Sequence, residues 1–237
     1  AARLGLKTLV LGASHSSELP IGGVITTTNV VENYPGFIRL TGTELSENIR
    51  KHAESYDLVS VKQEKVEDIE KTKEGFNVKT KKEEYFGKTI LFATGTKWKK
   101  LESPGAKEFE NKGVAYCALC DAPLFKNKVV AVVGGSDSAA KDALLLAEHV
   151  KKVYMIYRGE QIRPEPINLK RVLENKKIEI INNVNILEVR GEKNVKSVIL
   201  DKKYKDSYEL LLDGIFVSIG HVILSDIAKK IGVKTNE

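Results

Sequence analysis

The chain has 237 residues, of which 42% are hydrophobic and 30% charged, with a formal net charge of +6 at pH 7. This length and balance predict one or two globular domains with buried cores. No unbroken apolar run approaches the roughly 18 residues of a membrane-spanning helix, so we expect no membrane span and no membrane partner. The lysines are interspersed with glutamates rather than gathered in an arm with aromatic residues, so we expect no nucleic-acid partner.

The first hundred residues are predicted to form a strand, a helix and a meander. Residues 7–11 are predicted as a strand, preceded by Gly5 as the stop of a helical turn. Residues 43–56 carry apolar side chains at helical spacing, with Thr41 or Thr43 as the N-cap. Apolar patterns then predict strands at 58–66, 76–80 and 88–92.

From about residue 100, the pattern is typical of a parallel α/β domain. Residues 128–133 form a continuous apolar run, as in a strand that is buried on both faces. A glycine-rich turn, an apolar-faced helix through Leu146 and a strand at 153–157 follow. The remaining predicted elements are a short helix at 167–176 and strands at 178–181, 184–190, 195–200, 208–212 and 215–219.

The two cysteines of the chain, Cys117 and Cys120, are separated by two residues and followed by Asp121. This spacing lets the sulfurs form and open a small disulfide ring, and a nearby carboxylate can exchange protons with a thiol. The alternatives are two buried apolar cysteines or half of a zinc site. No paired spacing that would complete a zinc site occurs among the histidines, His15, His52, His149 and His221. We therefore predict a catalytic dithiol and no metal, in a reducing cytoplasm.

The glycine-rich turn after the strand at 128–133 predicts a nucleotide site. Backbone N–H groups at the start of a helix bind a pyrophosphate, and the helix dipole adds to the attraction. The segment fits G-x-G-x-x-G/A at its first and third glycine positions, with Ser136 at the second. The residues expected to bind the coenzyme here are Gly134, Gly135, Ser136, Asp137 and Ser138.

The next strand ends where folds of this type contact the ribose, and no acidic residue stands at 157 or 158. Arg158 and Arg163 could instead hold a 2′-phosphate through paired, charge-assisted hydrogen bonds. The sequence therefore favours NADPH, with NADH possible. The alternative is that both arginines are surface residues that pair with Glu160 and Glu165.

Further motifs follow one another along the chain at Gly22-Gly23, 26–28, 31–37, 93–96, 117–121, 134–140, Arg158 with Arg163, and 216–221. In this order they resemble the low-molecular-weight thioredoxin reductases, flavoproteins of the pyridine nucleotide–disulfide oxidoreductase family, over essentially the whole chain. The resemblance implies an α/β fold of two Rossmann-like, three-layer domains. A NAD(P)-binding domain at 100–220 would be inserted into a discontinuous FAD-binding domain at 1–99 and 221–237.

The resemblance also implies roles for residues and cofactors. Electrons would pass from NADPH through FAD to the dithiol, and then to thioredoxin or a similar small protein. Cys120 would lie near the flavin, Cys117 would attack the partner disulfide, and Asp121 would be the acid/base. Further cofactor-binding residues would be Gly12, Gly22, Gly23, Asn33, Thr94, Gly95, Ile219 and Gly220. A homodimer is expected, with hinges near 96–104 and 219–222.

The chain also departs from the family pattern. The N-terminal strand with its glycine-rich turn and the C-terminal segment with a Gly-Asp pair are absent, so we expect a sequence truncated at both ends. Val24 replaces a glutamine, Gly159 replaces a nucleotide-binding arginine, and 222–224 replaces a Pro-Asn pair.

Several functions remain compatible with these residues. Ser136 and the missing FAD segments would suit a non-catalytic nucleotide-binding fragment, whereas the intact Cys117, Cys120 and Asp121 favour an enzyme. A flavin-dependent dithiol oxidase and a peroxiredoxin-reducing flavoprotein are related alternatives. We predict a thioredoxin-disulfide reductase.

Overall fold

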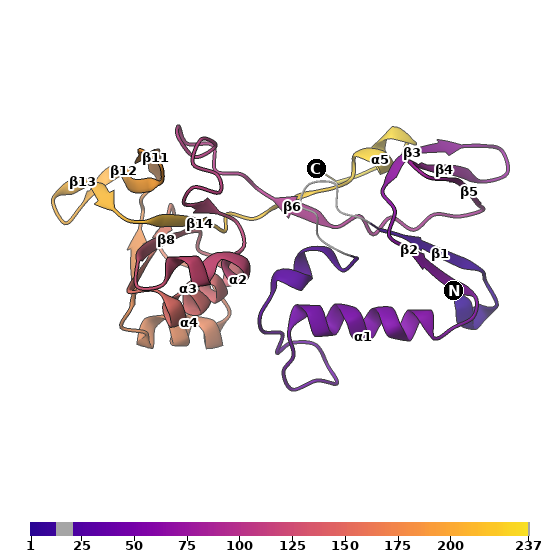
Figure 1. The fold of residues 1–237 in the computed structure, drawn as a ribbon, viewed down its shortest axis with the longest axis horizontal. Helices are drawn as coiled ribbons and strands as arrows, with labels where there is room; N and C mark the ends of the chain where they lie inside the picture. The colour runs from indigo at the N-terminus through magenta and orange to yellow at the C-terminus, as the bar shows by residue number, and fades with distance from the viewer. Residues whose placement is uncertain (13–20, 237) are drawn as a thin grey trace. The chain divides into compact units, whose positions relative to one another are not determined.

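The computed structural model describes residues 1–12 and 21–236, so His15 lies outside the described residues. The chain divides into two compact units. Unit 1 comprises Ala1–Lys97 and Val222–Glu237, and unit 2 comprises Trp98–His221 (Figure 1). Among the described residues, no helix is both long and apolar enough to cross a bilayer.

The chain passes from one unit to the other through strands β6 (Thr96–Trp98) and β15 (His221–Ile223), which are paired. At one end of this pair, the Leu224 N–H donates to the Gly95 carbonyl at 3.0 Å. Gly95 and Gly220 flank the pair with φ of +65° and +105°, a region that favours glycine. Both glycines are therefore required by backbone conformation, whatever else they contact.

Unit 2, described throughout, is built on a five-stranded sheet in the order β10-β9-β8-β14-β7, with every neighbouring pair parallel. Its strands are β7 (Val114–Ala115), β8 (Val129–Val133), β9 (Lys152–Tyr157), β10 (Ile178–Asn182) and β14 (Gly214–Val217). Its helices are α2 (Ala118–Asp121), η3 (Ala122–Phe125), α3 (Asp137–His149) and α4 (Pro166–Glu174). A second, antiparallel sheet contains β11 (Ile186–Gly191), β12 (Val195–Tyr204) and β13 (Ser207–Leu211).

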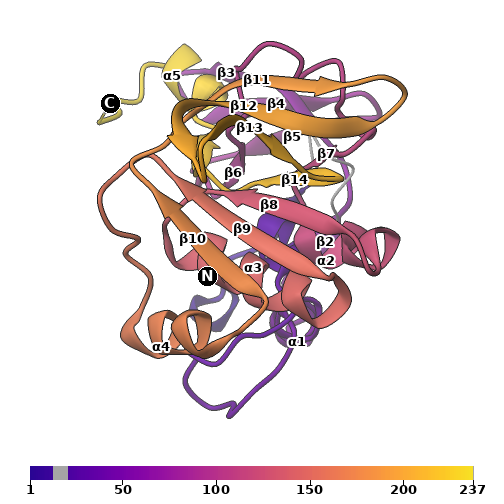
Figure 2. The ribbon, with the colours of Figure 1, turned by 90° about the vertical axis from the view of Figure 1, so that its left-hand side faces the viewer.

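Alternation along the central strands divides the core of unit 2 into two apolar layers. Val130 and Val132 pack with Leu146 of α3, whereas Ala131 packs with residues of the antiparallel sheet, such as Val198. The parallel sheet therefore lies between helices on one face and β11–β13 on the other (Figure 2). Burial on both faces explains the continuous apolar run that predicted β8.

Unit 1 combines a parallel strand pair with an antiparallel meander. Its elements are η1 (Ala2–Leu4), β1 (Thr8–Leu11), η2 (Gly23–Thr27), α1 (Gly42–Glu54), β2 (Val59–Lys62), β3 (Val66–Lys71), β4 (Phe76–Thr80), β5 (Glu84–Gly87) and α5 (Asp226–Lys230). In the described part of the unit, β1 pairs in parallel with β2, and β3-β4-β5 pair in order. Helix α1 begins with a capping box in which Thr41 and Glu44 bond each other's backbone.

Two strand predictions in unit 1 are wrong. The predicted strand 58–66 is divided into β2 and the start of β3, and residues 88–92 form no strand. The second error has a local cause, a tight turn after β4. In this turn the Thr80 hydroxyl accepts the N–H groups of Lys82 and Glu83 at 3.1 and 3.0 Å. The partner strand can therefore begin at Glu84, earlier than the apolar pattern indicates.

Replacing Leu146 by alanine should lower the free energy of unfolding by about 2–5 kcal/mol, because it leaves a cavity in the layer under α3. Leu146 is 0% exposed, whereas Leu173 on α4 is 65% exposed. The control Leu173→Ala should change stability by less than about 0.5 kcal/mol. Urea denaturation followed by far-UV circular dichroism measures both, and equal effects would contradict this packing.

Candidate active site

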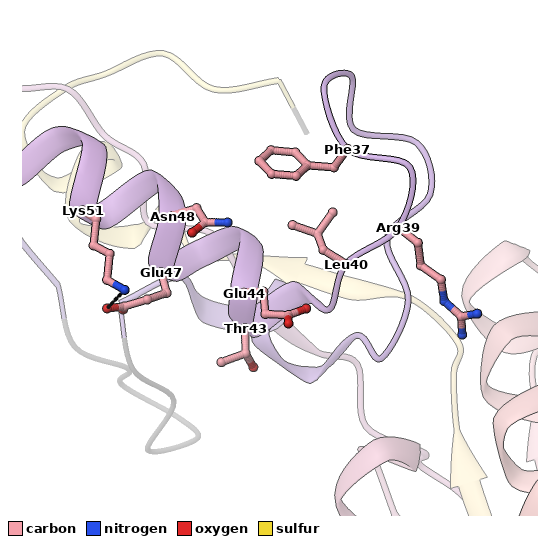
Figure 3. A pocket seen from close by; sticks show the side chains of 8 residues that line it. All are labelled: Phe37, Arg39, Leu40, Thr43, Glu44, Glu47, Asn48 and Lys51. Carbon is pink, nitrogen blue, oxygen red and sulfur yellow. Dashed lines mark ion pairs between the residues drawn. The ribbon is translucent and has the colours of Figure 1, made fainter.

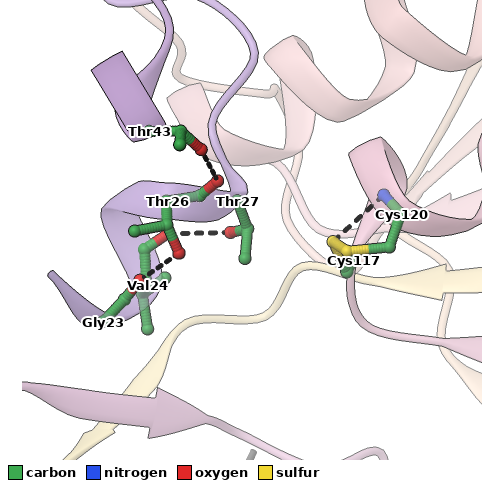
Figure 4. The surroundings of a disulfide bond; sticks show 7 residues. All are labelled: Gly23, Val24, Thr26, Thr27, Thr43, Cys117 and Cys120. Carbon is green, nitrogen blue, oxygen red and sulfur yellow. Dashed lines mark hydrogen bonds between the residues drawn. A yellow bond between two sulfur atoms is a disulfide. The ribbon is translucent and has the colours of Figure 1, made fainter. Parts of the chain in front are cut away.

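The two cysteines form a disulfide in unit 2 with a Cα–Cα distance of 5.3 Å (Figure 4). Cys117 is the N-cap of α2, and its sulfur accepts the backbone N–H of Cys120 at 3.1 Å. Ala118 and Ala122 anchor this segment in the apolar layer that also contains α3. The sulfurs are therefore held by a local hydrogen bond on a firmly packed backbone.

The two sulfur-bearing residues differ in exposure. Cys117 is 9% exposed, whereas Cys120 is exposed. Burial raises the pKa of the neighbouring Asp121 carboxyl. A carboxyl group with a raised pKa holds its proton closer to neutral pH, which suits an acid/base that serves a thiol.

Tyr116, directly before the dithiol, was not singled out by the sequence. The Lys100 ammonium lies 4.0 Å from the centroid of its ring and also pairs with Glu110. Burial, followed by the charge of Glu110, raises the pKa of the Tyr116 hydroxyl. These contacts join residues that are distant in sequence, so no local motif could have revealed them.

The predicted nucleotide turn lies at the carboxyl end of β8 and leads into α3. Gly134 has a φ of +147°, and a Cβ there would lie 2.2 Å from the Ser218 carbonyl oxygen. A Cβ on Gly135 would lie 2.4 Å from the ring of Tyr157. Neither position has room for a side chain, and Ser136 serves as the N-cap of α3. The turn therefore fits a nucleotide pyrophosphate, which needs close backbone approach at a helix start.

The structure gives Asp137 a role within the protein. Its carboxylate accepts the Glu165 backbone N–H at 3.0 Å and the Asn168 amide at 2.8 Å, and pairs with Lys141 at 2.9 Å. These bonds tie the start of α3 to α4. Ser138 follows it in the first turn of α3.

The two arginines expected at the 2′-phosphate are both exposed in unit 2. The Arg163 backbone N–H donates to the Gly135 carbonyl at 2.7 Å, which brings the 158–163 loop to the nucleotide turn. Within this unit, neither arginine forms an ion pair with Glu160 or Glu165. Both guanidinium groups therefore remain available to an anionic ligand.

In unit 1, two of the expected FAD-binding glycines, Gly12 and Gly22, are crowded, whereas Gly23 has open space around it. Gly12 directly follows β1, and a Cβ there would lie 2.9 Å from Ile21. Gly22 has a φ of +116°, and a Cβ there would lie 2.0 Å from the Ser46 hydroxyl. Gly23 opens η2, where its carbonyl accepts the Thr26 hydroxyl at 2.7 Å (Figure 4). Gly12 and Gly22 therefore leave no room for a side chain, which is compatible with the close approach of backbone to a dinucleotide.

The other cofactor-binding residues that the sequence predicts in unit 1 are Asn33, Thr94 and Gly95. Asn33 lies in an exposed turn. The Thr94 hydroxyl donates to the Leu224 carbonyl, next to the Gly95–Leu224 backbone bond. In unit 2, Ile219 is half-buried and packs against the layer of the antiparallel sheet, and Gly220 follows it.

A pocket of about 470 Å³ in unit 1 lies between α1 and the loop before it (Figure 3). Its lining residues are Phe37, Arg39, Leu40, Thr43, Glu44, Glu47, Asn48 and Lys51. Glu47 pairs with Lys51 and Arg50 along the helix. None of the predicted cofactor-binding residues lines this pocket.

A partly buried carboxyl group in unit 2 was also missed by the sequence analysis. Asp142 lies on α3 beside the buried Ala139 and Ala143. Burial raises the pKa of Asp142 to about 6. In the described ranges, 1–12 and 21–236, no three His, Cys, Asp or Glu side chains gather to hold a metal ion.

The geometry defines a class of protein: a two-unit α/β protein in which a nucleotide turn and an exchangeable disulfide share one domain. Comparison with known proteins agrees with this class. The family model described as "Pyridine nucleotide-disulphide oxidoreductase" matches residues 1–237. The chain belongs to the pyridine nucleotide-disulphide oxidoreductase family.

Within this family, the chain is similar to thioredoxin reductases. It is 36% identical to the thioredoxin reductase of Treponema pallidum over 224 residues, covering 94% of this chain and 71% of the relative. The Lactococcus lactis thioredoxin reductase structure (FR conformation) matches with a TM-score of 0.89 and 31% identity, covering 98% and 75%. One component of the Staphylococcus aureus alkyl hydroperoxide reductase is 35% identical over 221 residues, covering 92% and 42%.

These similarities confirm the predicted α/β fold class, with its Rossmann-like parallel sheet, and an oxidoreductase activity. The family uses FAD and NADPH, which confirms the predicted cofactors.

Replacing Asp142 by asparagine should stabilise the protein more at high pH than at low pH. The folded pKa of about 6 exceeds the ordinary value of 3.8, so the protonated carboxyl favours folding below about pH 4. The wild type loses this contribution to its free energy of unfolding as the pH rises through 6. Asparagine does not ionise, so the variant undergoes no such loss. The stability of Asp142→Asn relative to the wild type should rise by about 2 kcal/mol between pH 4.5 and 8. Urea denaturation at both pH values tests this, and a constant difference would contradict the burial of the charge.

Proposed function

We propose that the protein is a thioredoxin-disulfide reductase, which uses NADPH to reduce the disulfide of thioredoxin or a similar small protein. The observation that carries this proposal is the Cys117–Cys120 disulfide, packed into the same unit as the nucleotide turn at Gly134. The overall reaction is NADPH, a proton and a partner disulfide giving NADP⁺ and a partner dithiol.

The two units would divide the cofactors between them. We assign FAD to residues 1–99 and 221–237, where the crowded Gly12 and Gly22 support a dinucleotide. NADPH is assigned to residues 100–220, with its pyrophosphate on the turn at Gly134 and its 2′-phosphate at Arg158 and Arg163. When bound, FAD supplies a carrier for the electron pair between NADPH and a disulfide.

The residues of the chain perform the disulfide exchange. Reduction of the Cys117–Cys120 bond gives two thiols, and the Cys117 thiolate attacks the partner disulfide to form a mixed disulfide. The Cys120 thiolate then attacks the Cys117 sulfur, releases the reduced partner and restores the internal disulfide. The Cys120 N–H that bonds the Cys117 sulfur at 3.1 Å would stabilise the attacking thiolate.

Asp121 would move the protons that these steps require. It protonates the thiolate that leaves when the internal disulfide opens, and it accepts a proton from the attacking thiol. Burial raises its pKa, which favours the protonated form that this role requires. Because Cys117 is buried, its thiol must become accessible after reduction for the partner to reach it.

A homodimer and a cytoplasmic location complete the proposal. Both rest on the resemblance to the thioredoxin reductases, and a reducing compartment suits a dithiol that cycles. The similarity to the alkyl hydroperoxide reductase component supports a second partner class, a protein that reduces alkyl hydroperoxides.

The first test is the visible absorption spectrum of the purified chain. We expect flavin bands near stoichiometric amounts, retained on gel filtration, and bleached by NADPH in the absence of oxygen. A colourless protein that does not take up added FAD would overturn catalysis by this chain.

The second test is turnover with thioredoxin, followed as the loss of NADPH absorbance. Cys117→Ser and Cys120→Ser should each abolish it, since neither can form the internal disulfide. Asp121→Asn should lower kcat by about 10²–10⁴-fold, because an amide cannot transfer the proton.

The matched control for that assay is Asp206→Asn in the exposed turn between β12 and β13, which should keep full activity. Oxygen consumption without thioredoxin separates a dithiol oxidase from the reductase. Wild-type turnover in Asp121→Asn would remove Asp121 from the mechanism.

A further inference from the structure

Tyr157 ends β9 beside the nucleotide turn, and no step of the proposed reaction uses its side chain. Its half-buried ring packs against the apolar layer that contains α3. Strand β9 lies next to β8, and the Gly134 N–H donates to the Ile156 carbonyl at 3.0 Å. The ring therefore lies at the carboxyl edge of the sheet, where nucleotides bind in folds of this type.

Opposite edges of the Tyr157 ring face two glycines. A Cβ on Gly135 would lie 2.4 Å from Cδ2 and 2.6 Å from Cγ of the ring. A Cβ on Gly159 would lie 2.7 Å from Cε1 and 2.9 Å from Cζ. Neither glycine has a positive φ, so backbone conformation does not require glycine at either position. Space for the ring is what excludes a side chain at both.

The loop of residues 158–163, which carries both arginines, is fastened at two points on either side of this ring. At one point, the Gly159 carbonyl accepts the N–H of Asn183, the residue after β10, at 2.9 Å. At the other, the Arg163 N–H donates to the Gly135 carbonyl at 2.7 Å. Because the ring fills the space between Gly135 and Gly159, it sets the separation between the nucleotide turn and this loop.

That separation matters because one coenzyme must reach both segments. Its pyrophosphate is assigned to the turn at Gly134, and its 2′-phosphate to Arg158 and Arg163. Both groups are attached to a single adenosine, so the distance between them is limited. Paired hydrogen bonds from a guanidinium group also require a defined geometry. A displaced loop would lose its contacts with the 2′-phosphate, while the turn could still receive the pyrophosphate.

We propose that Tyr157 determines the coenzyme preference of this chain, as a positioning residue whose ring holds the 158–163 loop at the distance from Gly135 that a 2′-phosphorylated coenzyme requires. This inference rests on the proposed binding of NADPH by unit 2. It also accounts for Gly159, which stands where the thioredoxin reductases have a nucleotide-binding arginine. The ring occupies the space that a side chain at 159 would need.

The test is isothermal titration of the oxidised 237-residue chain with NADP⁺ and, separately, with NAD⁺, which lacks the 2′-phosphate. The wild type should bind NADP⁺ more tightly. Tyr157→Ala should raise the Kd for NADP⁺ about tenfold, as for one lost hydrogen bond to a charged group, and change the Kd for NAD⁺ less than about twofold. Tyr157→Phe retains the ring and should keep both Kd values.

Gly159→Ala tests the same contact from the side of the loop. Its Cβ would meet the ring at 2.7 Å, so the Kd for NADP⁺ should rise and that for NAD⁺ should not. In the Tyr157→Ala background there is no ring to displace, so adding Gly159→Ala should have no further effect. Additive effects of the two substitutions would contradict a shared contact.

The matched control is Tyr154→Ala on the same strand. The Tyr154 ring packs in the layer on the other face of the sheet, against Tyr204 at a centroid distance of 6.0 Å. This variant should leave the ratio of the two Kd values unchanged. A reduced ratio in the control would mean that truncating any tyrosine of β9 has this effect, and would overturn the role of Tyr157.

The outcomes separate the two proposals. If the wild type binds neither coenzyme, the proposed function fails and this inference fails with it. If the wild type binds NADP⁺ and Tyr157→Ala keeps the wild-type ratio, or weakens both coenzymes equally, the proposed function stands and Tyr157 has no positioning role. A loss in Tyr157→Phe as large as that in Tyr157→Ala would also overturn it, since the ring would then not be the group that acts.

Discussion

The burial of β8 on both faces is the constraint on which unit 2 depends. Neighbouring residues of this strand, Val130 and Ala131, enter different apolar layers, so the strand cannot slip by one residue without exchanging them. The fixed register places Gly134 at the edge of the sheet and starts α3 there. Ala118 of the dithiol segment packs in the same layer as Val130. The same apolar layer between the sheet and its helices therefore supports both the nucleotide turn and the disulfide.

The sequence predicted the elements of unit 2 closely because strands buried on both faces carry an unbroken apolar signal. The run at 128–133 corresponds to β8 at Val129–Val133. Unit 1 was harder, because its meander is partly exposed and side-chain hydrogen bonds shift its turns. The hydrogen bonds of the Thr80 hydroxyl close a tight turn, so β5 begins at Glu84. The pattern of apolar and polar residues over 80–92 does not indicate this earlier start.

The predictable part of the site is the part that is local in sequence. The spacing of Cys117 and Cys120 predicted their disulfide, and the glycines predicted a turn between a strand and a helix. Contacts between distant residues were not predictable, such as the Lys100 ammonium over the Tyr116 ring. Asp137 shows the converse: its place in the motif suggested a coenzyme contact, whereas its carboxylate is committed to α4.

The environment of the Cys117 sulfur has a consequence for electron transfer. The Cys120 N–H already donates to this sulfur in the oxidised state, and the buried Ala118 and Ala122 hold the backbone on either side of Cys120. The same donor can serve the sulfur as a thiolate, so opening the bond requires side-chain rotation without refolding of α2. The dithiol can therefore accept and release an electron pair without rearrangement of the α2 backbone, and the exposure that Cys117 needs for its partner must come from outside this turn.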